Sequence, residues 1–214
     1  MLHSFTYVSP AETAPVKAEL IEITHLVQDE VREYFTFTFW FVGSSKRNMI
    51  TRDQNSNTGY DFDINIQVND EDENYTAEEI KRYIRKAFDK IARRYGYDYC
   101  EDSTRVLTMK CKDWKRSCIV HSCDIAIVYD CSDGRQQYIH FNKAQNSYTW
   151  QYQPQNVTAL ADKIKWLKKN GHWDEVREYY IYKKNCNDNP HKHSRSIFAE
   201  TVADVCNWYG YNNP

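Results

Sequence analysis

The chain has 214 residues, of which 41% are hydrophobic and 27% are charged, and its formal net charge is −2. This length is enough for one large domain or two small ones, and the composition is ordinary for a globular protein. A net charge close to zero excludes a basic surface over the whole molecule of the kind that binds long nucleic acids. It favours a small anionic substrate that the protein binds jointly with a metal ion.

No stretch of the sequence approaches the ~18 consecutive apolar residues that span a membrane, and the N-terminus lacks the pattern of a signal peptide. We therefore expect a cytoplasmic protein with no membrane partner. The cysteines are odd in number and lack close pairs, which favours free thiols in a reducing compartment. Cys118, His121 and Cys123 are close enough to suggest zinc, but no fourth ligand is evident, so free thiols are expected.

The first half of the chain predicts helices and strands from its apolar periodicity and its strand-forming residues. The predicted elements are a helix over 11–34, strands over 35–42 and 60–68 joined by a polar loop over 45–59, and a helix over 76–95. Thr76 and Glu79 form the capping-box pattern at the start of this last helix.

The second half of the chain changes in character near residue 154. Before that point the sequence predicts strands over 105–111, 117–129, 136–141 and 148–152. After it, apolar positions at helical spacing predict helices over 156–170, 173–184 and 194–209. We therefore expect an α/β core over residues 1–153, followed by a C-terminal helical region over residues 154–214.

The most informative segment is the alternating strand over 60–68. Asp61 and Asp63 fall on one face of this strand, and Phe62 and Ile64 fall on the other. The Cα atoms of the two aspartates are then about 6–7 Å apart. Two like charges at this distance repel each other unless a cation lies between them, and oxygen ligands suit Mg²⁺ or Mn²⁺.

The pair Gly43-Ser44 comes directly after the preceding strand. Glycine allows the backbone to turn sharply and to come close to a ligand. Exposed amide groups and a serine hydroxyl can then hold a phosphate. A phosphate-binding turn beside a pair of metal-binding carboxylates is what the transfer of a nucleotide requires.

A strand, Gly43-Ser44, a loop and an Asp61-Phe62-Asp63 strand together resemble the signature of the DNA polymerase β-like nucleotidyltransferase superfamily. The extended loop between the two motifs is similar to that of the oligoadenylate synthase and cyclic-nucleotide synthase branches. The resemblance implies an α+β fold, in which a nucleotidyltransferase palm is followed by a small helical region. The palm is a mixed or antiparallel sheet flanked by helices.

The resemblance also implies an activity, the transfer of a nucleoside monophosphate from a nucleoside triphosphate (NTP) to an acceptor hydroxyl with release of pyrophosphate. The family's third acidic residue comes from a later strand, where Asp124 precedes an apolar stretch and Asp130 lies at the following turn. We select Asp124. Asp61, Asp63 and Asp124 would then be both the catalytic and the metal-binding residues, with Mg²⁺ or Mn²⁺ as the cofactor.

Residues that contact the nucleotide are expected in two places. Gly43, Ser44 and Lys46 would hold phosphates near the acidic site. Lys183 and Lys184 resemble helical-domain lysines that reach the triphosphate in related enzymes, and exposed lysines of a helix are the alternative.

Two other classes of function remain open. One is a catalytically inactive nucleotide- or RNA-binding module of the same fold, regulatory or part of a toxin–antitoxin pair. The other is a structural or interaction protein. The intact Asp-x-Asp pattern favours the enzyme, whose acceptor (nucleotide, nucleic-acid end, small molecule or protein) and base preference the sequence leaves open.

Overall fold

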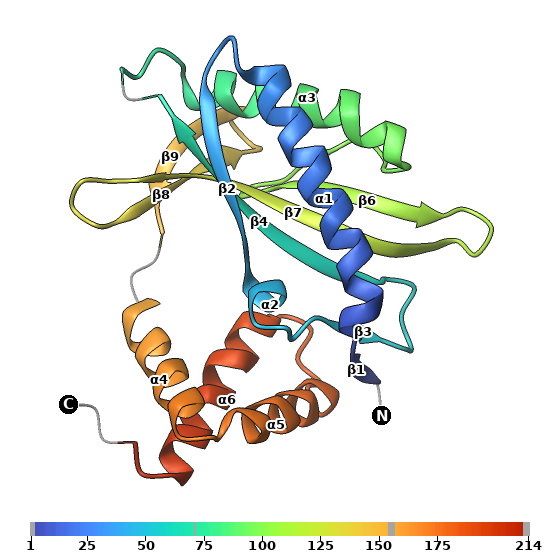
Figure 1. Cartoon of the computed structure of the whole chain (residues 1–214), viewed down its shortest axis with the longest axis vertical. Helices are drawn as coiled ribbons and strands as arrows, with labels where there is room; N and C mark the ends of the chain where they lie inside the picture. The colour runs from blue at the N-terminus through green and yellow to red at the C-terminus, as the bar shows by residue number, and fades with distance from the viewer. Residues whose placement is uncertain (1–2, 71, 154–156, 212–214) are drawn as a thin grey trace. The chain divides into compact units, whose positions relative to one another are not determined.

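The structure is a computed structural model that describes residues 3–70, 72–153 and 157–211 (Figure 1). The chain divides into two compact units. An α/β unit contains Val8–Thr51 and Asn57–Gln153, and a helical unit contains Met1–Tyr7, Arg52–Ser56 and Pro154–Pro214. None of the helices in the described ranges is both long and apolar enough to cross a membrane.

The α/β unit is built on a mixed, mostly antiparallel sheet. Its strands follow the order β2-β4-β7-β6-β5, while β8 pairs with β7 and β9 pairs with β8. Among the described strands of this sheet, only the neighbours β4 and β7 are parallel to each other. The strands are β2 (Thr36–Val42), β4 (Tyr60–Asn69), β5 (Glu101–Asp102), β6 (Leu107–Asp113), β7 (Cys118–Asp130), β8 (Gln136–Asn142) and β9 (Ser147–Tyr152).

Two long helices cover one face of this sheet, α1 (Pro10–Val31) and α3 (Ala77–Ala92) (Figure 1). Their apolar residues form a single core with the inward side chains of β4, among them Phe62, Ile64 and Ile66. The alternate residues of β4, which include Asp61 and Asp63, are exposed or half-buried. The predicted two-faced strand is thus confirmed, because burial of its apolar side chains fixes which face meets the helices.

Both helices begin within one residue of their predicted starts. The Thr76 hydroxyl accepts a hydrogen bond from the backbone amide of Glu79, and the Glu79 carboxylate accepts one from the amide of Thr76. The predicted capping box is therefore confirmed. Ser9 caps α1 in a similar way, by accepting from the amide of Glu12.

The helical unit contains α4 (Val157–Lys169), α5 (Trp173–Asn185) and α6 (Ser194–Trp208). All three helices were predicted, although Asn156, the predicted first residue of α4, lies outside the described residues. Two short strands, β1 (Phe5–Tyr7) and β3 (Thr51–Asp53), pair with each other. Arg52 and Asp53 of β3 belong to this unit.

The assignment of residues 3–7 and 52–56 to the helical unit differs from the prediction that placed residues 1–153 together. The side-chain amide of Asn185 accepts a hydrogen bond from the backbone amide of Phe5 at 2.6 Å and donates to its carbonyl at 3.2 Å. The Tyr7 hydroxyl donates to the carbonyl oxygen of Arg177 at 2.8 Å. These contacts join segments about 170–180 residues apart, so no local sequence pattern records them.

Candidate active site

The parallel pairing of β4 with β7 brings the predicted acidic residues together. In this register Asp63 lies opposite Asp124, and Asp61 lies opposite Ser122. Directly paired residues of neighbouring strands point to the same face of a sheet. The three carboxylates therefore share the face of the sheet opposite the one that α1 and α3 cover.

Two hydroxyl groups hold two of these carboxylates. The Ser122 hydroxyl donates a hydrogen bond to Oδ1 of Asp61, and the Thr108 hydroxyl on β6 donates to Oδ1 of Asp124 at 2.6 Å. Asp63 has no hydrogen-bond partner among the described residues. It is thus the carboxylate of the three that the protein leaves unsatisfied.

The electrostatics of the site disfavour negative charge on Asp63. The pKa of Asp63 is raised from 3.8 to about 6, chiefly by burial and also by the charges of Asp124 and Asp61, while Arg47 opposes this change. Burial also raises the pKa of Asp124, against the hydrogen bond from Thr108. A bound cation would remove this penalty, because it favours the charged form of a carboxylate.

The Gly43-Ser44 turn lies directly against Asp63. Gly43 follows β2 and starts the short helix α2 (Gly43–Lys46), with a positive φ of 61°. A Cβ atom on Gly43 would be only 2.2 Å from Oδ2 of Asp63. Glycine is therefore required here both for its backbone conformation and for the close approach of the backbone to the carboxylate.

The residues after Gly43 differ in their surroundings. Ser44 is half-buried, Ser45 is buried, and Lys46 is exposed. Arg47 is close enough to Asp63 for its charge to lower the pKa of that carboxyl. The turn thus carries both hydroxyl groups and positive charge beside the acidic residues, as a phosphate-binding turn needs.

The donor set has the chemistry that Mg²⁺ and Mn²⁺ prefer, since it consists of carboxylate oxygens beside one another on adjacent strands. In the parts of the chain that the structure describes, however, no group of three or more His, Cys, Asp or Glu side chains is arranged to hold a metal ion. The hydrogen bonds from Ser122 and Thr108 are consistent with this, because they orient Asp61 and Asp124 toward protein donors.

Lys183 and Lys184 lie on α5 of the helical unit, where both have protein contacts. The Lys183 amine is 2.7 Å from Oδ2 of Asp204 and 3.5 Å from Oε2 of Glu200. Lys184 is only 6% exposed, and its amine lies 3.7 Å from the centroid of the Phe5 ring. Lys184 is thus not the exposed lysine of the alternative interpretation, and the phosphate-binding role of both residues stays a prediction.

Sequence reasoning missed Ser122 and Thr108, the two hydroxyl groups that hold the carboxylates. Ser122 lies two residues before Asp124, so strand alternation alone places it on the same face. Its pairing with Asp61 depends on the parallel register of strands 60 residues apart, which the sequence does not record.

Comparisons with known proteins show which solved structures share this fold. No protein-family model matches the chain, and no curated protein matches it. Solved structures do match, among them the DncV cyclic AMP-GMP synthase of Vibrio cholerae, described as a prokaryotic cGAS homolog. Its TM-score is 0.68 at 11% identity, over 97% of this chain and 69% of that one.

The same synthase in complex with the linear intermediate 5′ pppA(3′,5′)pG matches with a TM-score of 0.67 and 11% identity, over 97% of this chain and 69% of that one. The CD-NTase CdnG of Bradyrhizobium diazoefficiens in complex with GTP matches with a TM-score of 0.52 and 12% identity. That alignment covers 95% of this chain and 49% of the other. This chain thus spans about half to two thirds of the length of these structures.

The predicted α+β architecture is confirmed, as is the predicted resemblance at the level of the fold. The chain has the same fold as the cyclic AMP-GMP synthase and the CD-NTase described above.

Proposed function

We propose that this chain is a metal-dependent nucleotidyltransferase that moves a nucleoside monophosphate from an NTP to an acceptor hydroxyl. The observation that carries the proposal is the position of Asp63, which is paired in register with Asp124 and lies against the backbone of Gly43. An unsatisfied carboxylate beside a second one and a glycine turn is costly for folding alone. A site for a cation and a phosphate explains why the three occur together.

Asp61, Asp63 and Asp124 would hold Mg²⁺ or Mn²⁺ in this proposal. When bound, the metal supplies positive charge that neutralises the triphosphate and lowers the pKa of the acceptor hydroxyl. The raised pKa of Asp63 supports this assignment, because the cation would stabilise the ionised form that the surrounding protein groups disfavour.

The protein itself would contribute the positions of the reacting groups. The backbone amides near Gly43, the Ser44 hydroxyl and Lys46 would bind the β- and γ-phosphates, and Lys183 and Lys184 would contact the triphosphate. The hydrogen bond from Thr108 to Oδ1 of Asp124 would fix the orientation of that carboxylate. Positioning and neutralisation of charge provide most of the catalysis in such transfers.

The transfer forms one bond and breaks another. The acceptor hydroxyl releases its proton to the solvent, its oxygen attacks the α-phosphorus in line, the bond from that phosphorus to the bridging oxygen of the β-phosphate breaks, and pyrophosphate leaves with the electron pair. The solved neighbours include complexes with GTP and with a linear dinucleotide intermediate, which supports an NTP as donor. The acceptor and the product, linear or cyclic, are left open.

One observation favours a second candidate, a catalytically inactive nucleotide- or RNA-binding module. Asp61 and Asp124 are each hydrogen-bonded to a protein hydroxyl, and the described residues contain no ready metal cluster. Such a protein would bind a nucleotide through the Gly43 turn without transferring it.

A product assay distinguishes the two candidates. The chain is incubated with α-labelled ATP, GTP, CTP and UTP, singly and in pairs, with Mg²⁺ or Mn²⁺, and pyrophosphate and labelled products are measured. We expect metal-dependent pyrophosphate release that Asp63→Asn and Asp124→Asn abolish. The control variant Asp130→Asn changes an exposed carboxylate further along β7 and should keep the activity. Nucleotide binding without any pyrophosphate release would favour the binding module.

A further inference from the structure

The turn between β6 and β7 carries an exposed tryptophan, Trp114, which is 74% exposed. The β6–β7 hairpin extends past α1 in Figure 1. Within the turn, the Asp113 carboxylate accepts hydrogen bonds from the backbone amides of Lys115 and Arg116 at 3.0 and 3.1 Å. The turn is therefore held in shape by its own contacts, and it presents Trp114, Lys115 and Arg116 to the solvent.

A second exposed aromatic residue, Tyr99, lies in the loop after α3 and is 59% exposed. Its neighbour Asp98 donates its backbone amide to the carbonyl oxygen of Lys110 on β6 at 2.9 Å. The Asp98 carboxylate is also 2.6 Å from the Lys112 amine at the end of β6. The loop after α3 and the hairpin thus lie side by side.

Each of the two exposed rings has a cation beside it. The Lys112 amine is 5.0 Å from the centroid of the Trp114 ring, and the Arg93 guanidinium is 4.3 Å from the centroid of the Tyr99 ring. Because Lys112 contacts both Asp98 and Trp114, the two pairs of ring and cation adjoin. We refer to residues 93–94, 98–99 and 112–116 together as the hairpin surface.

The hairpin surface is basic, although the whole chain has a net charge of −2. Five of its residues are lysine or arginine, and two, Asp98 and Asp113, are acidic. A local surplus of positive charge attracts a polyanion even when the whole protein does not. Aromatic side chains beside basic ones are typical of surfaces on which the bases of a single strand stack while cations contact its phosphates.

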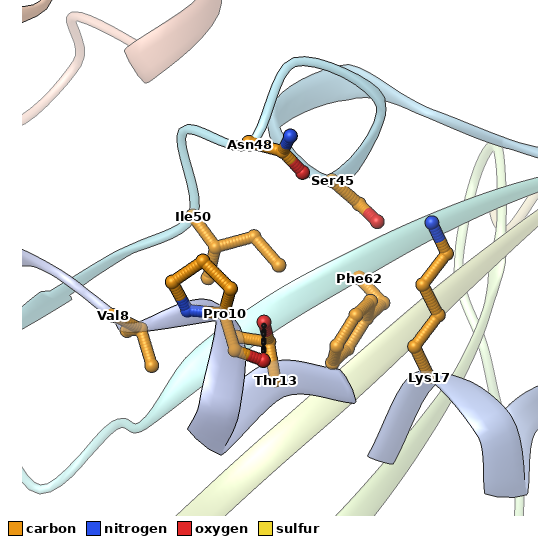
Figure 2. A pocket seen from close by; sticks show the side chains of 8 residues that line it. All are labelled: Val8, Pro10, Thr13, Lys17, Ser45, Asn48, Ile50 and Phe62. Atoms are coloured by element: carbon orange, nitrogen blue, oxygen red, sulfur yellow. Dashed lines mark hydrogen bonds between the residues drawn. The ribbon is translucent and has the colours of Figure 1, made fainter. Parts of the chain in front are cut away.

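The hairpin surface is separate from the candidate active site. Six residues along β7 lie between Cys118, where the turn ends, and Asp124, which corresponds to about 20 Å. It also shares no residue with the small cavity at the start of α1 that Phe62 helps to line (Figure 2). That cavity has a volume of about 40 Å³, which is room for about three water molecules and not for a nucleotide.

We propose that the hairpin surface binds single-stranded nucleic acid. Bases stack on Trp114 and Tyr99, and the neighbouring lysines and arginines contact the phosphates. Stacking and phosphate contacts read neither the edges of the bases nor the 2′-hydroxyl, so RNA and DNA bind alike and with little sequence preference. A duplex binds more weakly, because its bases already stack on one another.

Fluorescence anisotropy of the full chain with labelled oligo(U) and oligo(dT) of about 15 nucleotides tests the proposal. We expect saturable binding of both at about 50 mM salt, and weaker binding at about 200 mM, because phosphate contacts release counterions. Trp114→Ala should weaken binding about tenfold, as the loss of one stacked base predicts. Lys115→Gln should weaken it and make the salt dependence less steep.

Two matched changes elsewhere in the chain serve as controls. Trp208→Ala removes a tryptophan of the helical unit that is 56% exposed, and Lys86→Gln removes an exposed lysine of α3. Both variants should bind the oligonucleotides like the wild type. Trp114→Ala should keep metal-dependent nucleotide binding, and Asp63→Asn should keep oligonucleotide binding, so this proposal and the proposed function can each fail without the other.

The proposal is overturned if neither oligonucleotide binds saturably at about 50 mM salt. It is equally overturned if Trp114→Ala and Lys115→Gln, shown to be folded by circular dichroism, bind both strands like the wild type. A duplex of the same length that binds as tightly as the single strands would rule out stacking on the two rings. Binding to vesicles of anionic phospholipid without binding to either oligonucleotide would assign the hairpin surface to a membrane instead.

Discussion

The backbone of Gly43 lies so close to Asp63 that a Cβ atom at Gly43 would be 2.2 Å from Oδ2 of that carboxylate. A turn that starts a helix and a strand that carries an acidic residue are thus packed against each other without an intervening side chain. This contact ties the position of the proposed phosphate-binding turn to that of the carboxylate proposed to bind metal.

Substitution of Gly43 by alanine should therefore cost more than its backbone conformation alone. A left-handed backbone costs an alanine about 1–2 kcal/mol, and the contact with Asp63 adds to this. Gly96→Ala is the matched control, because Gly96 also has a positive φ but has nothing within 4 Å of a Cβ atom. Urea denaturation should show a larger loss for Gly43→Ala, and equal losses for the two variants would show that the close approach has no consequence.

The pH dependence of stability should reveal that ionisation of Asp63 destabilises the folded protein. Its pKa is raised to about 6 in the folded protein, so ionisation is disfavoured by roughly 3 kcal/mol relative to the unfolded chain. The metal-free Asp63→Asn variant should then be more stable than the wild type above pH 6. This advantage should shrink as the pH falls from 6 to 4, because the wild-type carboxyl becomes protonated.

The control for this effect is Asp130→Asn, since Asp130 is exposed and accepts a hydrogen bond from the Gln136 amide. The stability of Asp130→Asn relative to the wild type should not rise as the pH is raised from 4 to 7.5. Chemical denaturation of metal-free protein at pH 4, 5, 6 and 7.5 measures both variants. If Asp63→Asn is destabilising at pH 7.5, Asp63 has a stabilising partner and the electrostatic account of the site is wrong.

The sequence predicted the parts of the fold that depend on local patterns. The alternation of β4 and the Thr76–Glu79 capping box both appear in the structure, because burial and helix capping act over a few residues. The short strands β1, β3 and β5 and the helix α2 were not predicted, since two to four residues carry no periodic signal. The pairing of β1 with β3 moreover joins segments that are distant in sequence.

The distinction between local patterns and the pairing of distant segments also explains which parts of the site could be predicted from the sequence. Asp61, Asp63 and Gly43 belong to one continuous motif, and that motif indicated the site. The register that pairs Asp63 with Asp124, and the hydroxyl partner Thr108, come from strand pairing between distant segments. A single sequence holds no record of that pairing, because many registers bury the same apolar residues.

A buried ion pair should stabilise the α/β unit at the edge of the sheet. The Lys81 amine is 2.7 Å from Oδ1 of Asp102 and donates to the carbonyl oxygen of Ser103, and Lys81 is only 2% exposed. Burial lowers the pKa of Lys81, against the effect of Asp102.

Lys81→Met should therefore cost about 3–5 kcal/mol of unfolding free energy, because it leaves Asp102 without its charged partner. Lys86→Met, on the exposed side of the same helix, should change it by less than about 0.5 kcal/mol. Urea denaturation at pH 7.5 compares the two variants. Similar small effects would mean that Asp102 finds another partner, such as Arg85 at 3.9 Å.

Asp53 should hold the N-terminal strand in the helical unit. Burial alone would raise its pKa, but hydrogen bonds from the Ser4 and Asn55 amides and the His3 ring outweigh burial and lower it. A lowered pKa stabilises the folded state above the ordinary value of 3.8, and this stabilisation is lost as the pH falls through the folded-state pKa.

Asp53→Ala should consequently cost about 1–3 kcal/mol at pH 7, since it leaves these donors without an acceptor. The cost should decrease below pH 4. Asp188→Ala changes an exposed aspartate of the same unit and serves as the control. Hydrogen exchange of the amides of residues 4–7 should speed up in Asp53→Ala alone, and unchanged exchange there would show that Asp53 does not hold the strand.

The most direct test of the central claim is nucleotide binding that depends on a metal and on Asp63, because it needs no knowledge of the acceptor. Thermal unfolding is followed with ATP, GTP, CTP or UTP at millimolar concentration, with and without Mg²⁺ or Mn²⁺, for wild type, Asp63→Asn and Asp130→Asn. A ligand that binds only the folded state raises the melting temperature. We predict a metal-dependent rise with at least one nucleotide, kept in Asp130→Asn and lost in Asp63→Asn. No metal-dependent rise with any nucleotide, or an equal rise in Asp63→Asn, would contradict the assignment of these carboxylates to nucleotidyl transfer.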